Sequence, residues 1–214
     1  MRQRPVKNLE ELIAENSAYK VEDPKGMKGK WASLFNNPEK PLWLEVGSGK
    51  GQFAVGMAMA HPEVNFIACE AVPKIYVRIL QKATELQLDN LMVLCERIEL
   101  ITDYFADDEL ERLFLNFSDP WPKNTHEKRR LTYGKKLELY KKILKNGSVI
   151  QFKTDNDALF EYSLEQFDLC GFKYVFTRDL YSSEYAAGNI TTEYEDRFAA
   201  RGKNINFARL DVIK

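Results

Sequence analysis

The chain has 214 residues, of which 44% are hydrophobic and 29% charged, and its formal net charge at pH 7 is −1. This composition is typical of a globular domain with a sizeable core, and it excludes a largely disordered or a polybasic protein. The charge is unevenly distributed, because residues 85–119 hold ten acidic and two basic side chains, whereas residues 123–145 hold nine basic and two acidic ones. The basic segment predicts a surface that can bind a polyanion.

Other features of the sequence indicate the cellular compartment and the domain organisation. The sequence lacks the apolar run of roughly 18 residues that a membrane span needs, and its first residues lack the apolar centre of a signal peptide. Three cysteines without CxxC spacing are typical of a reducing compartment, so we expect a cytoplasmic protein. With only two histidines, we expect no metal site. Residues 1–40 are polar and contain several Pro and Gly, and we interpret them as an arm that could be flexible, before a single domain over residues 41–214.

From Pro41 onward, short apolar runs alternate with segments of helical length. The runs predict strands over residues 42–47, 65–71, 91–96, 110–119, 148–155, 172–180 and 205–213. Helices are expected over residues 52–60, 73–88, about 128–145 and 158–170. Strands joined by helices predict an α/β fold, with a seven-stranded, mostly parallel sheet and helices on both faces. The last two strands lack a full helix between them, which indicates an antiparallel edge.

In open parallel sheets, ligands bind beyond the carboxyl ends of the strands. The segments that follow the predicted strands should therefore converge on one edge of the sheet. These segments are residues 45–51, Glu70, Glu96 with Arg97, residues 116–123 and residues 153–156.

A glycine-rich turn, Gly47-Ser48-Gly49-Lys50-Gly51, follows the first strand. It is not a P-loop, since Gly51 stands where a P-loop has Ser or Thr, and its spacing is not GxGxxG. The glycines let a ligand approach the backbone closely, which suits a nucleoside, although a plain strand-to-helix turn is the alternative. Glu45 lies within the apolar strand end and needs a cationic partner, for which a ligand ammonium would suffice.

The second strand ends in Glu70, about 20 residues beyond the glycine turn, where an acidic residue can accept hydrogen bonds from both hydroxyls of a ribose. A solvated glutamate is the alternative. The fourth strand leads into Asp119-Pro120-Trp121-Pro122. The prolines make this turn rigid, which can hold a carboxylate and an aromatic plane near a flat base. The basic residues after it could also form a solvated helix face.

A glycine turn followed by a strand-ending acid resembles the class I S-adenosylmethionine-dependent methyltransferases. Together with NFSDPWPK, HEKRRL, TDN at 154–156 and NITTEYEDRF at 189–198, the chain resembles the bacterial tRNA (guanine-N7-)-methyltransferase family over nearly its whole length. The resemblance implies a Rossmann-like fold, S-adenosylmethionine as cofactor, tRNA as partner, and N7 of guanosine 46 in the variable loop as target. Nothing in the sequence requires a metal, and we expect no membrane partner and no obligatory protein partner. We expect a monomer or a homodimer, in which the arm of residues 1–40 faces the RNA.

The resemblance also implies residue roles, with Asp119 as the catalytic residue between cofactor and base. The residues implied in cofactor binding are Glu45, Gly47, Gly49, Gly51, Glu70, Glu96, Arg97 and Asp119. Those implied in binding the target guanosine are Lys123, Asp155, Thr192, Glu193, Tyr194 and Glu195. Those implied in RNA binding are Thr125, His126, Glu127, Lys128, Arg129 and Arg130, with help from Arg2 and Arg4. Arg97 departs from the family, which usually has Asp or Asn there, and an arginine side chain cannot accept a hydrogen bond from adenine.

Other functions are compatible with parts of the pattern. DPWP superficially resembles the DPPY-type motif of methyltransferases that act on exocyclic base amines. A non-catalytic RNA-binding descendant of the fold is a second alternative, but it would have no use for a ribose-reading acid. A nicotinamide-dependent dehydrogenase fits less well, because Gln52 occupies the place of the third glycine in the dinucleotide motif.

Overall fold

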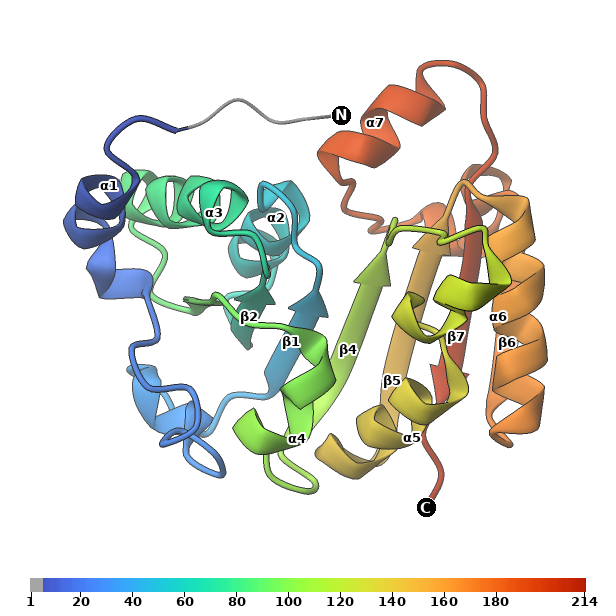
Figure 1. Ribbon diagram of the computed structural model, residues 1–214, viewed down its shortest axis with the longest axis horizontal. Helices are drawn as coiled ribbons and strands as arrows, with labels where there is room; N and C mark the ends of the chain where they lie inside the picture. Colours follow the sequence, from blue (N-terminus) through green and yellow to red (C-terminus); the bar gives the residue numbers. More distant parts are fainter. Residues whose placement is uncertain (1–5) are drawn as a thin grey trace.

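Seven strands form one sheet in the computed structural model, which describes residues 6–214 (Figure 1). The strands are β1 (Leu42–Val46), β2 (Asn65–Cys69), β3 (Leu91–Leu94), β4 (Leu110–Asn116), β5 (Leu144–Thr154), β6 (Lys173–Thr177) and β7 (Asn206–Asp211). Their order is β3-β2-β1-β4-β5-β7-β6, with β1 to β5 parallel and β7 antiparallel to both neighbours. The predicted α/β sheet with an antiparallel edge is confirmed, and β7 lies between β5 and the edge strand β6.

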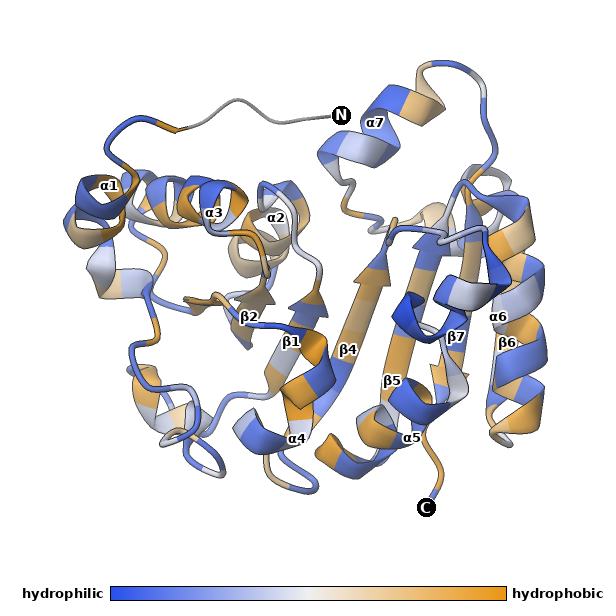
Figure 2. Ribbon diagram, in the orientation of Figure 1, coloured by the Kyte–Doolittle hydropathy of each residue, from blue (hydrophilic) through white to orange (hydrophobic). Residues whose placement is uncertain are grey.

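Helices cover both faces of this sheet. The helices are α1 (Leu9–Glu15), α2 (Gln52–Ala60), α3 (Pro73–Leu86), α4 (Ile101–Tyr104), α5 (Gly134–Ile143), α6 (Asp157–Leu169) and α7 (Glu193–Ala199). Successive strand residues point to opposite faces, so Phe66 of β2 joins the core cluster of α2 and α3, whereas Ile67 joins that of α4, α5 and α6. Figure 2 shows hydrophobic residues along β4 and β5 and mainly hydrophilic ones on α7.

The segment before β1 packs on the domain. Val21 donates its N–H to the carbonyl of Val93 in β3, at 3.2 Å. The ring of Trp31 is fully buried, stacks on Phe105 at 4.7 Å and donates to the carbonyl of Tyr104 at 2.7 Å. Arg2 and Arg4 lie outside the described residues, and an RNA-facing role for this segment stays a prediction. Within residues 6–214 the structure shows no helix with the length and apolarity to cross a membrane.

The structure differs from the expected elements around the basic segment. Instead of one helix over residues 128–145, a 3₁₀ helix at Asn124–Arg129 is followed by extended residues, and α5 begins only at Gly134. The buried Arg130 breaks the helix, because its guanidinium is held by the carbonyls of Pro120 and Trp121. The expected start of the helix at about Lys128 was therefore wrong, although α5 keeps most of the later basic residues of this segment on a helix.

Two further elements, the end of β4 and the short helix α7, differ from the prediction. β4 ends at Asn116, before the expected Asp119, because Phe117 adopts a left-handed backbone conformation with φ of 50°. The TEYE motif forms the start of a short helix, α7, which the sequence pattern did not predict. Its N-terminus is capped by Thr192, whose hydroxyl accepts from the Glu195 N–H at 2.9 Å.

Candidate active site

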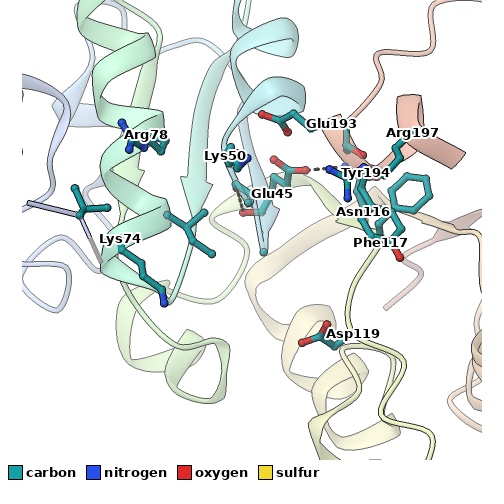
Figure 3. A pocket seen from close by; sticks show the side chains of 16 residues that line it. Glu45, Lys50, Lys74, Arg78, Asn116, Phe117, Asp119, Glu193, Tyr194 and Arg197 are labelled. Atoms are coloured by element: carbon teal, nitrogen blue, oxygen red, sulfur yellow. Dashed lines mark hydrogen bonds between the residues drawn. The ribbon is translucent and has the colours of Figure 1, made fainter. Parts of the chain in front are cut away.

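Two clefts open at the carboxyl edge of the parallel strands. The larger, of about 670 Å³, lies between α3 and α7 (Figure 3). The predicted site residues that line it are Glu45, Gly47, Gly49, Asp119, Thr192, Glu193 and Tyr194. The smaller cleft, of about 390 Å³, is lined by five of the predicted residues, Gly47, Glu70, Glu96, Arg97 and Arg129. Gly47 lines both clefts, so they meet at the glycine turn.

The glycine turn is shaped by left-handed backbone conformations, with φ of 78° at Gly47, 55° at Gly49 and 84° at Gly51. The N–H groups of Gly47 and Ser48 both donate to the carbonyl of Cys69, at 2.8 and 3.0 Å. A Cβ at Gly47 or Gly49 would meet nothing within 4 Å, whereas a Cβ at Gly51 would lie 2.9 Å from a methyl of the fully buried Ile79. The first two glycines therefore leave room for a ligand, and the third allows packing against α3.

This difference predicts unequal effects of alanine at two of the glycines. Gly49→Ala is expected to lower the free energy of unfolding by about 1–2 kcal/mol, the cost of a left-handed alanine. Gly51→Ala is expected to cost about 2–4 kcal/mol, because overpacking against Ile79 is added. Urea denaturation of the two variants measures the difference. Equal losses would show that the Ile79 contact is accommodated without strain.

Glu70 joins the turn to the loop before α3. Its Oε2 accepts from the Gly49 N–H and its Oε1 from the Val72 N–H, both at 2.9 Å. The residue is 7% exposed, and burial raises the pKa of its carboxyl above the ordinary value despite these bonds. Each carboxylate oxygen has a second lone pair, so the group can still accept from hydroxyls of a ligand in the smaller cleft.

Glu45 and Asn116 form an incompletely paired polar group at the base of the larger cleft. Glu45 is 1% exposed, and its Oε1 accepts from Asn116 Nδ2 at 2.8 Å. Its Oε2 and the Oδ1 of Asn116 have no hydrogen-bond partner among residues 6–214. Burial raises the pKa of Glu45 to about 7. These two unpaired acceptors, one of them on the buried acid itself, fit a ligand ammonium. An ammonium can donate three hydrogen bonds, and its positive charge would balance the negative charge of Glu45.

Asp119 lies exposed on a strained turn that lines the larger cleft. Phe117 and Trp121, two residues before and after it, both have left-handed backbones, with φ of 50° and 42°. Arg130 holds this turn by donating to the carbonyls of Pro120 at 3.2 Å and Trp121 at 3.1 Å. Non-glycine residues in such conformations persist where the surroundings enforce them, and they cluster at functional sites.

A buried ion pair supports the segment that leads into α7. Lys153 of β5 and Glu195 of α7 are both 0% exposed, and Lys153 Nζ lies 2.7 Å from Glu195 Oε2. The ammonium also donates to Asn189 Oδ1 at 3.0 Å and the Ile190 carbonyl at 2.9 Å, so all three protons are used. Glu195 Oε1 accepts from Tyr181 at 3.0 Å and Asn189 at 2.7 Å. Burial lowers the pKa of Lys153, and the charge of Glu195 opposes that shift.

The residues expected at the target guanosine thus occupy different environments. Tyr194 lines the cleft and stacks on Phe198 at 4.5 Å. Burial raises the pKa of the Tyr194 hydroxyl, the charges of Asp155 and Asp119 raise it further, and the charge of Arg197 opposes the shift. Glu193 pairs with Lys82 at 2.8 Å. The carboxylate of Glu195 is fully engaged inside the protein.

Lys153 was missed as a site residue by sequence reasoning. A signal was nevertheless present, since a lysine inside the apolar run of a buried strand requires an acidic partner. The sequence could not tell which of the acids would be that partner.

The segment expected to contact RNA is only partly exposed. Its exposed side chains are Lys123, Thr125, Lys128 and Arg129, whereas His126 is half-buried with its ring edge toward Trp121, at 5.6 Å between centroids. Glu127 accepts from the hydroxyl of Tyr162 at 2.9 Å. Arg130 is 9% exposed and holds the Asp119 turn.

The two residues expected near the adenine line the smaller cleft with different orientations. Glu96 accepts from the hydroxyl of Tyr104 at 2.8 Å. The side chain of Arg97 is 76% exposed and lies 3.5 Å from Glu99.

Known proteins are similar to this chain in sequence and in fold. A family described as "Putative methyltransferase" matches residues 39–208. The tRNA (guanine-N(7)-)-methyltransferase of Oceanobacillus iheyensis is 47% identical over 96% of this chain and 96% of its own length. Those of Geobacillus sp. (strain WCH70) and Bacillus subtilis (strain 168) are 45% and 42% identical, covering 96% and 99% of this chain and 93% and 99% of their own.

Solved structures show the same fold at lower identity. An antibiotic-related methyltransferase matches with a TM-score of 0.62 at 15% identity, covering 91% of this chain and 96% of its own. An S-adenosylmethionine-dependent methyltransferase from Aquifex aeolicus matches with 0.58 at 16%, covering 97% and 100%. The fold is therefore the Rossmann-like methyltransferase fold. By the identity and coverage of its relatives, the chain belongs to the tRNA (guanine-N7-)-methyltransferase family.

Proposed function

We propose that this protein transfers a methyl group from S-adenosylmethionine to N7 of guanosine 46 in the variable loop of tRNA. One observation carries the proposal: a single cleft joins the incompletely paired Glu45, the exposed Asp119 and the aromatic ring of Tyr194. This supplies a place for a cationic cofactor tail beside a place for a flat base. We further propose that it acts in the cytoplasm without an obligatory protein partner, as a monomer or homodimer.

The residues at both clefts fit the cofactor. S-adenosylmethionine, when bound, supplies a methyl group on a positively charged sulfur. Glu45 and Asn116 would hold its ammonium, since both have an orphaned acceptor. Glu70 would accept from the ribose, and the smaller cleft would take the adenine. Because the Arg97 side chain lies beside Glu99 and cannot accept, the adenine amine would donate to the Arg97 backbone or to Glu96.

The chain's role at the base is mainly alignment and charge stabilisation. Guanine N7 carries an in-plane lone pair and no proton, so its attack requires no general base. The ring gains positive charge as it is methylated, and Asp119 would stabilise that charge. Tyr194 offers a face on which the base can stack, and Asp155 can accept from the guanine N1–H and amine, which adenine does not present together. Glu195 would act through Lys153, by fixing the segment that carries Tyr194.

The raised pKa of Glu45 predicts an effect of pH on the ligand-free protein. Because the folded pKa of about 7 lies above the ordinary 4.5, stability falls as pH rises from 4.5 to 7. The loss is roughly 3 kcal/mol above pH 7. Glu45→Gln removes this charge, so it is expected to raise the melting temperature at pH 8 and to change it little at pH 5. The same variant should bind S-adenosylmethionine at least about tenfold more weakly, because a buried charge partner is lost.

Thermal melts at both pH values and calorimetric titration with S-adenosylmethionine check these expectations. A variant less stable than the wild type at pH 8 would contradict the assignment of Glu45 as a buried charge without a counter-ion.

The direct test of the function is methyl transfer from labelled S-adenosylmethionine to unmodified tRNA, followed by identification of the labelled nucleoside. Label in 7-methylguanosine is expected, and a tRNA with adenosine at position 46 should accept none. Label in an N-methylated exocyclic amine would overturn the target atom but keep cofactor and fold. Binding of both ligands without transfer would indicate a non-catalytic RNA-binding protein.

A further inference from the structure

The larger cleft has basic side chains on its rim that lie outside the basic segment of residues 123–145. They are Lys50 in the glycine turn, Lys74 and Arg78 on α3, and Arg197 on α7. Figure 3 shows Lys74 and Arg78 on one wall, Arg197 beside Tyr194 on the opposite wall, and Lys50 between them. In the part of the chain that the structure describes, none of the four forms an ion pair. Arg78 donates only to the neutral side chain of Gln81, at 2.9 Å.

Acidic side chains do not neutralise this rim. Three acids line the same cleft over residues 6–214: Glu45, Asp119 and Glu193. Glu45 is buried at the base, and Glu193 is paired with Lys82 at 2.8 Å. Asp119 is the one exposed, unpaired acid among them, so the mouth of the cleft carries an excess of positive charge although the whole chain has a net charge of −1.

A nucleotide within an RNA chain brings two phosphates with it when its base enters a cleft. One of them follows the chain in each direction, so both sides of the mouth meet negative charge. The exposed Lys123, Lys128 and Arg129, which are expected to contact RNA, follow Asp119 in the chain and would serve one side. The other side is the wall formed by α3, where Lys74 and Arg78 are one helical turn apart and share a face.

On the basis of the proposed function, we propose that Lys74 and Arg78 form a second contact for the tRNA backbone, holding phosphate next to the target guanosine on the α3 side. Arginine and lysine are the usual partners of phosphate in protein–nucleic acid complexes. The tRNA strand is then held from both walls, with the base presented between them. Lys50 belongs to the glycine turn and lies closer in chain position to the cofactor residues, so the test uses the α3 pair.

The test measures tRNA affinity across a range of salt concentrations. The variant Lys74→Gln/Arg78→Gln keeps two good helix formers on α3. The magnitude of the slope of log K against log salt is expected to fall by roughly 0.7–0.9, the contribution of the one phosphate on the α3 side that the variant no longer neutralises. The dissociation constant for tRNA should rise about tenfold near 0.1 M salt. Calorimetry should find the affinity for S-adenosylmethionine within about twofold of wild type.

The matched control is Lys30→Gln/Lys173→Gln, which removes two exposed positive charges that do not line the cleft. Its slope should equal that of wild type, which separates a local contact from an effect of net charge. An α3 variant with the slope of the control would overturn the proposal. A loss of S-adenosylmethionine affinity with an unchanged tRNA slope would also overturn it, by assigning the pair to the cofactor's carboxylate.

Failure of this inference is distinguishable from failure of the proposed function. Wild-type protein that labels 7-methylguanosine while the α3 variant keeps its slope leaves the function in place and removes only the phosphate contact. Wild-type protein that labels a different nucleoside overturns the proposed function, and the slope still reports whether α3 contacts the backbone.

Discussion

Replacing Asp119 by alanine is expected to lower the single-turnover rate of methyl transfer to tRNA by about 10²–10³-fold. The base gains positive charge during the reaction, and Asp119 is the exposed carboxylate that lines the cleft on a turn fixed by Arg130. Because the turn positions the group in advance, little reorganisation is needed when the charge develops. Binding of S-adenosylmethionine should change by less than about tenfold, since the larger stabilisation belongs to the transition state.

Two further variants make the result specific. Asp119→Asn keeps the shape and removes the charge, so it should lose nearly as much rate as the alanine variant. Asp107→Ala removes an exposed acid that does not line the cleft and should leave the rate unchanged. Near-wild-type turnover of Asp119→Ala with intact cofactor binding would contradict a role for this carboxylate at the base.

Replacing Lys153 by methionine is expected to lower the free energy of unfolding by about 3–5 kcal/mol. The change leaves the carboxylate of Glu195 buried without its counter-charge, and it also removes the donor to Asn189 and the Ile190 carbonyl. Methionine fills similar volume, so a cavity contributes little. Urea denaturation measures the loss.

A double variant separates stability from positioning. Lys153→Met/Glu195→Leu removes both charges, and its stability should recover most of the loss, as replacement of buried ion pairs by apolar residues often does. Its KM for tRNA is expected to exceed that of wild type, because the polar attachment of residues 189–195 to β5 is gone. Its kcat, which we propose depends on Asp119, should change little. A double variant with both stability and KM of wild type would show that the pair is structural only.

The fold could be predicted from the sequence because its strands are strongly apolar and end in recognisable turns. The 3₁₀ helix and the extended stretch around Arg130 could not be predicted, because they depend on hydrogen bonds from Arg130 to Pro120 and Trp121, about ten residues away. The helical periodicity of the sequence gives no sign of these bonds. α7 escaped prediction because it is short and polar and is held by contacts with distant elements, such as the bond of Gln52 to Asp196 at 2.6 Å.

In the candidate site too, some residues could be predicted from the sequence and others could not. Glu45 lies near the end of β1, and Glu70 and Asp119 follow the ends of β2 and β4. Parallel topology brings such residues to one edge of the sheet. Glu195 was expected beside the base because of its motif, but its carboxylate is buried in an ion pair with Lys153. The sequence did not indicate Lys74 and Arg78 as site residues, because their position on the rim depends on how α3 packs across the cleft from α7.

Because the carboxylate of Glu45 is incompletely paired, cofactor binding is expected to depend on pH. Because burial raises its pKa to about 7 in the free protein, this carboxyl changes its protonation state near neutral pH. The ammonium that we propose Glu45 holds would be bound by the ionised form, so its binding would expel a proton from molecules in which the carboxyl is protonated. Cofactor binding and proton release would then be linked. A fall in pH would weaken cofactor binding, because protons compete for the carboxylate of Glu45, without any change in the tRNA.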